Sequence, residues 1–250
     1  MQSICYASSA ILPAKNLPVT ELPAQKSEFV QALFSAIAKR YDLANHLLSG
    51  GLDFLWRRRA ARLVQSWQAT RILDLATGSG DLAITLRQFN AHALIVGADF
   101  CPPMLREAQR KGVTHLVAAD GMRLPFADAT FDAVTIAFGL RNMESWPKAL
   151  AEIGRVLRTH GHVLVLDFSM PSAPIRWLYR PYLHHVLPRV AALLTGEKAA
   201  YDYLGRSIEA FPHGTAMCAL LSQAGFDEAA AEALSGGIVS LYAARRNRLN

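Results

Sequence analysis

The feature that most constrains the fold is a regular alternation of short β-rich runs with helical stretches between Arg71 and Phe168. Strands that alternate with helices in this way run parallel to one another, and the helices cover both faces of the sheet. Two more β-rich runs follow a helix that is predicted near residues 207–224. The expected fold is therefore α/β with a mainly parallel sheet of seven strands, at residues 71–76, 93–98, 115–119, 131–138, 162–168, 226–233 and 238–244.

The segments around this alternation define the rest of the expected organisation. Residues 1–27 contain three prolines and no consistent hydrophobic period, and we expect a mobile tail rather than a secretory signal or a transit peptide. Residues 28–250 are expected to form a single domain. Its parts are a helical cap at 28–68, the sheet core at 69–170, a proline-interrupted helical insert at 171–205 and the last part of the sheet at 206–244.

The composition limits the class of protein. A chain of 250 residues that is 52% hydrophobic and 18% charged holds one buried core, which excludes a disordered regulator. No apolar stretch approaches the roughly 20 residues of a membrane-spanning helix. The three cysteines form no Cys-x-x-Cys pair, which indicates neither a disulfide framework nor a zinc site and favours the cytoplasm.

The net charge of +6 raises the question of a nucleic-acid partner. The basic residues fall in separate runs, at 57–59, 106–111 and 245–248, and no aromatic residues are interleaved at stacking intervals. A solvated basic surface is therefore the favoured interpretation, and no nucleic acid is expected. Attraction of the same residues to an anionic membrane face stays open.

A glycine-rich segment lies where the first strand leads into the next helix, in the sequence Leu73-Asp74-Leu75-Ala76-Thr77-Gly78-Ser79-Gly80-Asp81-Leu82. Open parallel sheets bind ligands at the carboxyl ends of their strands, and glycine lets a ligand approach the bare backbone. The spacing Gly78-x-Gly80-x-x-Ala83 also fits the relaxed dinucleotide fingerprint. The turn alone therefore does not choose between cofactors.

Carboxylates near this turn favour a cationic ligand, such as the sulfonium of S-adenosylmethionine, over a dinucleotide. Asp74 and Asp81 place negative potential where a pyrophosphate would lie. Asp99 ends the second strand about 20 residues beyond the turn, where ribose hydroxyls are bound in both cofactor classes. Asp120 ends the third strand, where an acid reaches an adenine amino group. A helix cap or a turn acid is the alternative, which is favoured for Asp81 but not for Asp99 or Asp120.

Several longer motifs are similar to those of one family. The segment Tyr41-Asp42-Leu43-Ala44-Asn45-His46-Leu47-Leu48-Ser49-Gly50-Gly51 resembles the first signature of the quinone-biosynthesis C-methyltransferases, which are class I S-adenosylmethionine-dependent enzymes. Residues 137–142, 155–158, 185–189 and 201–208 are similar to later family motifs, so the resemblance covers most of the chain. The chain departs from the family pattern at Ala44, Asp53, Ala137, Thr159, His160 and Asp167.

The resemblance implies a Rossmann-like fold with an antiparallel last strand, and C-methylation of a prenylated quinol at the inner membrane surface. Demethylmenaquinol is the favoured substrate, and a polyprenyl benzoquinol is the alternative. S-adenosylmethionine is the implied methyl donor, bound by Gly78, Ser79, Gly80, Asp99, Asp120, Gly121 and the backbone of Ala137.

The resemblance also implies catalytic residues. Arg141 would stabilise a phenolate, and Asn142 would hold the hydroxyl or a water. Tyr41 and Asp42 lie on a segment that would close over the cofactor, and His46 is an alternative base. For Arg141 a neighbouring carboxylate partner is the competing interpretation, and for Asn142 it is a helix cap.

Other interpretations stay open beside this one. The apolar residues of the insert, together with Arg176, Arg180 and Arg189, fit a lipid interface around an isoprenoid tail and a homodimer surface equally well. The adjacent His184 and His185 lack the spacing of a metal pair, so no metal is expected. The rival functions are an NAD-dependent oxidoreductase and a non-catalytic membrane adaptor.

Overall fold

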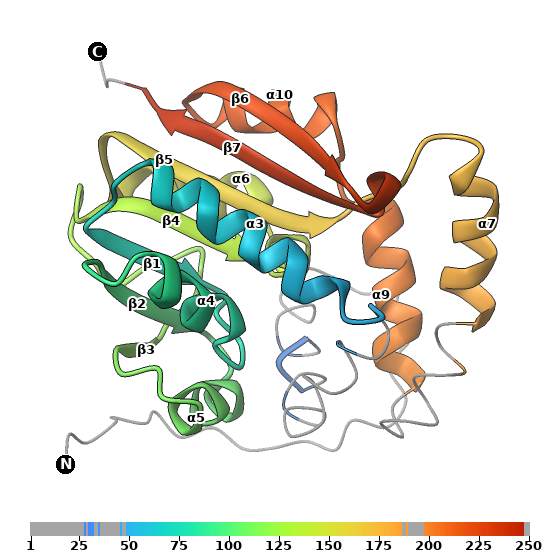
Figure 1. The fold of residues 1–250 in the computed structure, drawn as a ribbon, viewed down its shortest axis with the longest axis horizontal. Helices are drawn as coiled ribbons and strands as arrows, with labels where there is room; N and C mark the ends of the chain where they lie inside the picture. Colours follow the sequence, from blue (N-terminus) through green and yellow to red (C-terminus); the bar gives the residue numbers. More distant parts are fainter. Residues whose placement is uncertain are drawn as a thin grey trace.

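The computed structural model describes residues 28, 30–32, 35, 46, 49–186, 189 and 198–247. In this part of the chain the strands form one sheet, in the order β3-β2-β1-β4-β5-β7-β6 (Figure 1). Neighbouring strands from β3 to β5 are parallel, whereas β7 is antiparallel to both β5 and β6. The mainly parallel sheet with an antiparallel last strand is therefore confirmed. The strands are β1 (Arg71–Leu75), β2 (Leu94–Asp99), β3 (Leu116–Ala118), β4 (Phe131–Ala137), β5 (Leu157–Phe168), β6 (Phe226–Leu234) and β7 (Val239–Arg246).

Helices cover both faces of this sheet (Figure 1). One buried core joins the sheet to α3 and α4, and a second joins it to α6 and α10. Ile72 of β1 belongs to the first core and its neighbour Leu73 to the second, because successive side chains of a strand point to opposite faces. The longer helices are α3 (Leu52–Ser66), α4 (Asp81–Phe89), α5 (Pro102–Arg110), α6 (Trp146–Val156), α7 (Ile175–Pro181), α9 (Lys198–Ala210) and α10 (Thr215–Gln223); η1 (Leu140–Asn142), η2 (Tyr182–Val186) and η3 (Ser235–Gly237) are short helical segments.

The single helix predicted near residues 207–224 is wrong, because two helices occupy this region. α9 ends at Ala210 and α10 begins at Thr215. Gly214, directly before α10, has φ +57° and ψ −128°, a conformation that residues with a side chain rarely adopt. The fifth strand also begins earlier than predicted. It starts at Leu157, which pairs with Phe131 of β4 before the register shifts.

Several sequence predictions are not tested by this architecture. The predicted tail, residues 1–27, lies outside the described residues, and the boundaries of cap, core and insert stay predictions. Within the described ranges, no helix has both the length and the apolar character that crossing a bilayer requires. The His, Cys, Asp and Glu side chains in those ranges form no group of three or more that could hold a metal ion.

The two-core architecture predicts that α6 contributes strongly to stability. Leu150 of α6 is fully buried, so Leu150→Ala should lower the free energy of unfolding by about 2–5 kcal/mol. Leu94 of β2 is 42% exposed, and Leu94→Ala should change it by no more than about 0.5 kcal/mol. Urea unfolding monitored by circular dichroism measures both values. Equal losses in the two variants would contradict the burial that we assign to α6.

Candidate active site

The glycine turn joins β1 to α4 at the carboxyl edge of the sheet. Gly78 and Gly80 both have positive φ, of +57° and +86°. A Cβ atom at Gly80 would lie 2.7 Å from Val113 Cγ2, so this glycine allows close packing against the segment that follows α5. Gly78 instead lines a pocket. The two glycines therefore have different roles, and only Gly78 offers its backbone to a ligand.

That pocket lies at the carboxyl ends of β1, β2 and β4 and beside the segment after β3. The space between its walls is about 680 Å³, open solvent at its mouth included. Five of the residues predicted to bind the cofactor line it, whereas Ser79 and Gly80 do not. Its described lining consists of Ala76, Gly78, Asp99, Phe100, Met104, Asp120, Gly121, Met122, Ala137, Phe138, Gly139, Asn142, Met143 and Glu144.

The charged side chains in this lining are all acidic. Asp99, Asp120 and Glu144 contribute carboxylates, and the described lining residues include no lysine, arginine or histidine. Carboxylates on several sides of one pocket attract a cation and repel an anion. The pocket therefore favours a positively charged ligand and disfavours the pyrophosphate of a dinucleotide.

Asp99 is held in place by backbone amides. Its Oδ2 accepts a hydrogen bond of 2.8 Å from Gly78 N–H, and its Oδ1 accepts one of 2.8 Å from Cys101 N–H. The residue is 6% exposed, and burial raises its pKa to about 6 although these amide hydrogen bonds act against the rise. The same carboxylate that faces the pocket therefore also fixes the glycine turn.

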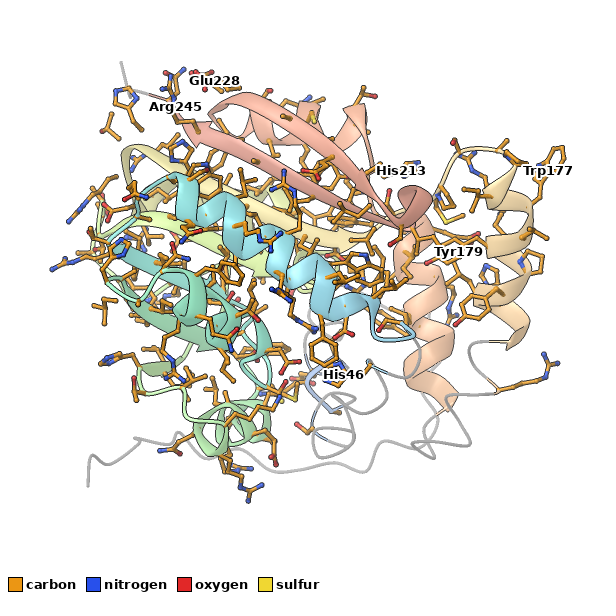
Figure 2. All side chains as sticks on the ribbon, in the orientation of Figure 1. His46, Trp177, Tyr179, His213, Glu228 and Arg245 are labelled. Carbon is orange, nitrogen blue, oxygen red and sulfur yellow. The ribbon has the colours of Figure 1, made fainter. Side chains whose placement is uncertain are left out.

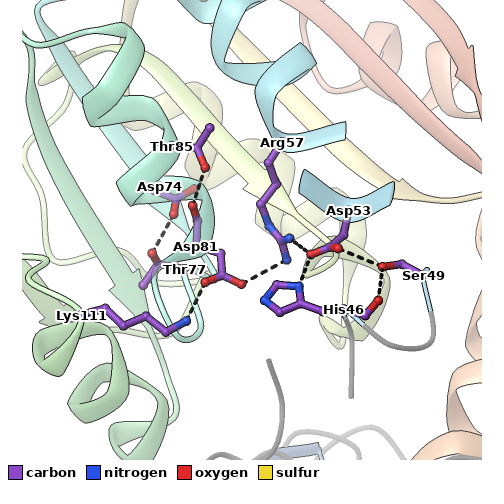
Figure 3. A network of polar contacts seen from close by, with 9 residues as sticks. All are labelled: His46, Ser49, Asp53, Arg57, Asp74, Thr77, Asp81, Thr85 and Lys111. Atoms are coloured by element: carbon purple, nitrogen blue, oxygen red, sulfur yellow. Dashed lines mark hydrogen bonds and ion pairs between the residues drawn. The ribbon is translucent and has the colours of Figure 1, made fainter. Parts of the chain in front are cut away.

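Asp74, the other acid of this edge, is a structural residue. It is 1% exposed, and its carboxylate accepts hydrogen bonds of 2.6 Å from Thr77 and 2.8 Å from Thr135 (Figure 3 shows the Thr77 bond). Burial raises its pKa to about 6 against the effect of these two bonds. Asp74 does not line the pocket, so its main effect is to tie the turn to β4.

The segment after β3 contributes an exposed acid and a buried glycine. Asp120 lines the pocket, and its Oδ1 accepts a hydrogen bond of 2.9 Å from Met122 N–H. A Cβ atom at Gly121 would lie 2.6 Å from Met143 Cε, so the missing side chain makes room for a methionine that also lines the pocket. An adenine contact by Asp120 stays a prediction.

The segment after β4 packs closely against the end of β1. A Cβ atom at Gly139 would lie 2.4 Å from Ala76 Cβ, so only glycine fits between the ends of β4 and β1. Phe138 before it has φ +57°, which is uncommon for a residue with a bulky side chain. Sequence reasoning singled out Ala137 here and missed Gly139, although the pair Phe138-Gly139 is itself a turn signal.

Asn142 presents an unsatisfied acceptor in this pocket. The residue is 9% exposed and lines the pocket, and its Nδ2 donates a hydrogen bond of 3.2 Å to the carbonyl of Phe138. Its Oδ1 is buried and has no hydrogen-bond partner in the described part of the chain. Because an unpartnered buried polar atom is costly, we infer that a ligand or a water completes the contacts of Asn142.

Arg141 forms a buried ion pair outside the described pocket lining. Its Nη1 lies 2.6 Å from Asp167 Oδ1 and donates a hydrogen bond of 2.6 Å to the carbonyl of Phe138. Burial raises the pKa of Asp167, and the Arg141 guanidinium opposes that rise. The neighbouring carboxylate that sequence reasoning kept as an alternative is thus present. Stabilisation of a phenolate by Arg141 stays a prediction.

A chain of charged contacts links α3 to the helix that follows the glycine turn (Figure 3). Arg57 of α3 contacts Asp53 on the same helix, and its Nη2 lies 3.4 Å from Asp81 Oδ2. Lys111 Nζ lies 2.6 Å from the other oxygen of Asp81, and His46 Nδ1 lies 2.7 Å from Asp53 Oδ2. Sequence reasoning missed Arg57, although its spacing of four from Asp53 on a helix is a recognisable pair signal.

The segments before α3 are described only at a few positions. Tyr41 and Asp42, two predicted catalytic residues, lie outside the described residues. Gln31 Nε2 donates a hydrogen bond of 2.9 Å to the carbonyl of Phe100, which lines the pocket, and Ser35 Oγ lies 3.4 Å from Cys101 Sγ. The N-terminal part of the chain therefore contacts the loop that carries Asp99.

Comparison with known proteins decides the family. A model of the ubiE/COQ5 methyltransferase family matches residues 21–246, which is most of the chain. The chain belongs to the ubiE/COQ5 methyltransferase family. It is therefore an S-adenosylmethionine-dependent C-methyltransferase, and S-adenosylmethionine is its methyl donor.

Individual relatives of this ubiE/COQ5-family chain cover nearly its full length. A demethylmenaquinone methyltransferase of Thermus thermophilus is 46% identical over 220 residues, which are 86% of this chain and all of that protein. A ubiquinone/menaquinone biosynthesis C-methyltransferase of Syntrophotalea carbinolica is 44% identical over 86% of this chain and 93% of its own. The crystal structure of a SAM-dependent methyltransferase from Thermotoga maritima shares the fold, with a TM-score of 0.63, 16% identity and coverage of 87% of this chain and 99% of that one.

The residues of the pocket fit this methyl donor. Three lining carboxylates match a sulfonium, and Asn142 offers an acceptor that the described protein groups leave unpaired. The bare backbone of Gly78 and the carboxylate of Asp99 lie side by side, as their hydrogen bond shows. Asp99 and Gly78 are thus the residues that we expect to hold the cofactor, and Asn142 leaves its acceptor for a second ligand of the same pocket.

The raised pKa of Asp99 predicts a pH-dependent affinity for S-adenosylmethionine. Because this pKa is about 6, the carboxylate is ionised above that pH and loses its charge as the pH falls through it. Affinity should therefore be highest above pH 6 and decrease below it. Asp99→Asn should weaken binding roughly 10- to 100-fold above pH 6 and remove the dependence on pH. Isothermal titration calorimetry between pH 5 and pH 8 measures both effects.

Asp120→Asn is the matched control for this titration. Asp120 lines the same pocket, but it is exposed, so the variant should keep the pH dependence of the unmodified protein. An Asp99→Asn protein that still loses affinity below pH 6 would assign the titration to another group and contradict our interpretation.

Proposed function

We propose that this protein transfers the methyl group of S-adenosylmethionine to a ring carbon of demethylmenaquinol, a prenylated naphthoquinol. The name of the Thermus thermophilus relative, all of whose length is matched by this chain, supports this ring type. A polyprenyl benzoquinol is the second candidate. It is supported by the Syntrophotalea carbinolica relative, whose name joins ubiquinone and menaquinone biosynthesis.

The single structural observation that carries the proposal is the acidic pocket at the carboxyl edge of the sheet. Its described lining has three carboxylates and no basic side chain, so it suits a sulfonium donor and an uncharged, electron-rich acceptor. An NAD-dependent oxidoreductase would instead have to bring a pyrophosphate between Asp99, Asp120 and Glu144. That rival is therefore disfavoured by electrostatics as well as by family.

Bound S-adenosylmethionine supplies an electrophilic methyl group on a positively charged sulfur. The protein supplies position, because an acceptor held in line with that group reacts without the entropic cost of a bimolecular encounter. Asp99 and Gly78 would fix the donor side of the pocket. Asn142 would accept a hydrogen bond from the quinol hydroxyl through its unpartnered Oδ1. Arg141, through Phe138 and Asp167, would hold the turn that carries Asn142, in addition to the phenolate contact proposed for it.

The substrate assignment predicts a specific product. Purified protein, isotope-labelled S-adenosylmethionine and chemically reduced demethylmenaquinone should give a product that carries one labelled methyl group on its ring carbon, identified by mass spectrometry. A matched demethylated benzoquinol with the same tail should react at least about tenfold more slowly, which corresponds to about 1.4 kcal/mol of transition-state selectivity. Asp99→Asn should lower the yield in both reactions because it weakens binding of the donor.

The outcomes of this assay separate the competing functions. Faster methylation of the benzoquinol would replace our substrate with the second candidate. Lack of product from either quinol would contradict the enzymatic proposal and favour the non-catalytic adaptor, provided that the protein still binds vesicles.

We also propose that α7 contacts the lipid surface from which a prenylated quinol must be taken. Ile175, Trp177 and Leu178 of this helix are 40%, 74% and 81% exposed. Figure 2 shows Trp177 on the outer side of α7, whereas Tyr179 lies on the side of α9 and is buried. Tryptophan is favoured where an apolar phase meets water, and the neighbouring Arg176 is an exposed cation that suits anionic headgroups, whereas Arg180 is exposed but paired with Glu209.

This proposal predicts a loss of vesicle binding in a defined variant. Trp177→Ser combined with Leu178→Ser should weaken binding to vesicles of equal parts phosphatidylglycerol and phosphatidylcholine by at least about tenfold, because two large apolar side chains no longer insert. Leu94→Ser, which changes an exposed leucine of β2, should bind as the unmodified protein does. Sedimentation with vesicles measures the affinities. Unchanged vesicle binding, together with a loss of dimer in analytical ultracentrifugation, would show that α7 is a homodimer surface instead.

A further inference from the structure

The imidazole of His46 is held in one orientation by a contact at Nδ1 and by stacking of its ring. Its Nδ1 lies 2.7 Å from Asp53 Oδ2, and Asp53 Oδ1 accepts a hydrogen bond of 2.9 Å from Ser49. The ring also stacks on Phe54, with 4.3 Å between ring centroids and 22° between planes. In the described part of the chain Nε2 has no hydrogen bond or ion pair among those found, and Figure 3 shows this nitrogen turned away from Asp53. A histidine fixed at Nδ1 by a carboxylate offers Nε2 as a base.

This pair is linked to the wall of the pocket through Arg57. Asp53 also contacts Arg57, whose guanidinium carbon lies 5.8 Å from the centroid of the Phe138 ring. Phe138 lines the pocket, and the second Arg57 nitrogen, Nη2, lies 3.4 Å from Asp81, the first residue after the glycine turn. The path from His46 to the pocket wall therefore runs through two side chains, those of Asp53 and Arg57.

Arg141 and Asn142, the two predicted catalytic residues that the structure describes, are unsuited to accept a proton. Arg141 is a guanidinium, which stays protonated in proteins, and it is already paired with Asp167. The amide of Asn142 is not basic. The reaction needs a base, because carbon is a poor nucleophile until the neighbouring hydroxyl of the quinol loses its proton.

We propose that His46 is the general base of the reaction, oriented by Asp53, and that its Nε2 takes the proton of the quinol hydroxyl next to the ring carbon that is methylated. This inference rests on the proposed function. The electron pair of the ionised oxygen moves into the ring, a ring electron pair forms the new carbon–carbon bond, and the methyl–sulfur bond breaks with its electron pair left on sulfur. The ring carbon then gives its hydrogen to water as a proton, and the imidazolium returns its proton to the ring oxygen. One proton is released in total.

The charges around His46 are compatible with this role. Burial acts to raise the pKa of Asp53, but the Arg57 charge and hydrogen bonds from Ser49, Arg57 and His46 lower it overall. Asp53 is therefore ionised at neutral pH and can hold the ring through Nδ1. Beyond Asp53, the charged groups in this network are Arg57 on α3, Asp81 on α4 and Lys111 after α5.

Two substitutions at His46 separate a base from a structural histidine. His46→Asn keeps a donor for Asp53 and removes Nε2, and we expect kcat to fall about 10²- to 10⁴-fold. His46→Ala should show the same loss, and added imidazole should restore part of the rate. In both variants the affinity for S-adenosylmethionine should stay within about twofold of that of the unmodified protein. His184→Ala is the matched control, because His184 also pairs with a carboxylate, Glu209 at 3.3 Å, on the α7 side of the molecule.

Ionisation of a bound naphthol provides a readout that does not need turnover. With 1-naphthol as the probe, the naphtholate absorbance of the complex should develop at lower pH in the unmodified protein and in His184→Ala than in His46→Asn. Identical titrations in all three proteins, or a kcat of His46→Asn within about tenfold of the unmodified value, would overturn the assignment. If the unmodified protein methylates no quinol and the naphthol still ionises through His46, the proposed function fails while the base stands.

Discussion

The hydrogen bonds of one buried carboxylate hold the carboxyl edge of this sheet together. Asp74 in β1 is almost fully buried, and it accepts hydrogen bonds from Thr77 in the glycine turn and from Thr135 in β4. A buried carboxylate without partners costs several kcal/mol, so the turn and the fourth strand must both stay within hydrogen-bond reach of it. Asp99 anchors the same turn from β2 by accepting the amide of Gly78. The turn is thus fixed from two sides, and the pocket beyond it keeps its shape.

The kind of donor that satisfies each acid decides where charge remains. Asp74 and Asp99 are bound by hydroxyls and amides, which are neutral, so their ionised forms contribute negative potential near the pocket. Asp53 and Asp167 are bound by Arg57 and Arg141, so their charge is balanced locally. Aspartates therefore serve two purposes here. Those with neutral hydrogen-bond donors attract a cationic methyl donor, and those paired with an arginine form a charge-balanced support around the pocket.

Sequence reasoning predicted the strands and the glycine turn because their signals are local. Hydrophobic patterns located β1, β2 and β4 to within a few residues, and the positions of Asp99 and Asp120 after their strands placed both in the pocket lining. It failed at the break between α9 and α10, which spans residues 211–214, although Pro212 and Gly214 are both turn signals. It also missed the close approach of Gly139 to Ala76, since those residues are more than sixty positions apart in the chain.

The sequence by itself determined the alternation of strands and helices, the burial of the sheet on both faces and the positions of acids at strand ends. These features follow from residue type and from spacing along the backbone. Only the tertiary structure decided which acids keep their charge. Arg141 and Asp167, 26 positions apart, become an ion pair when β4 and β5 align, and Arg57 of α3 meets Asp81 of α4 when these two helices pack. Such pairings depend on distances that exist only after the sheet and its helices have packed, and no local pattern records them.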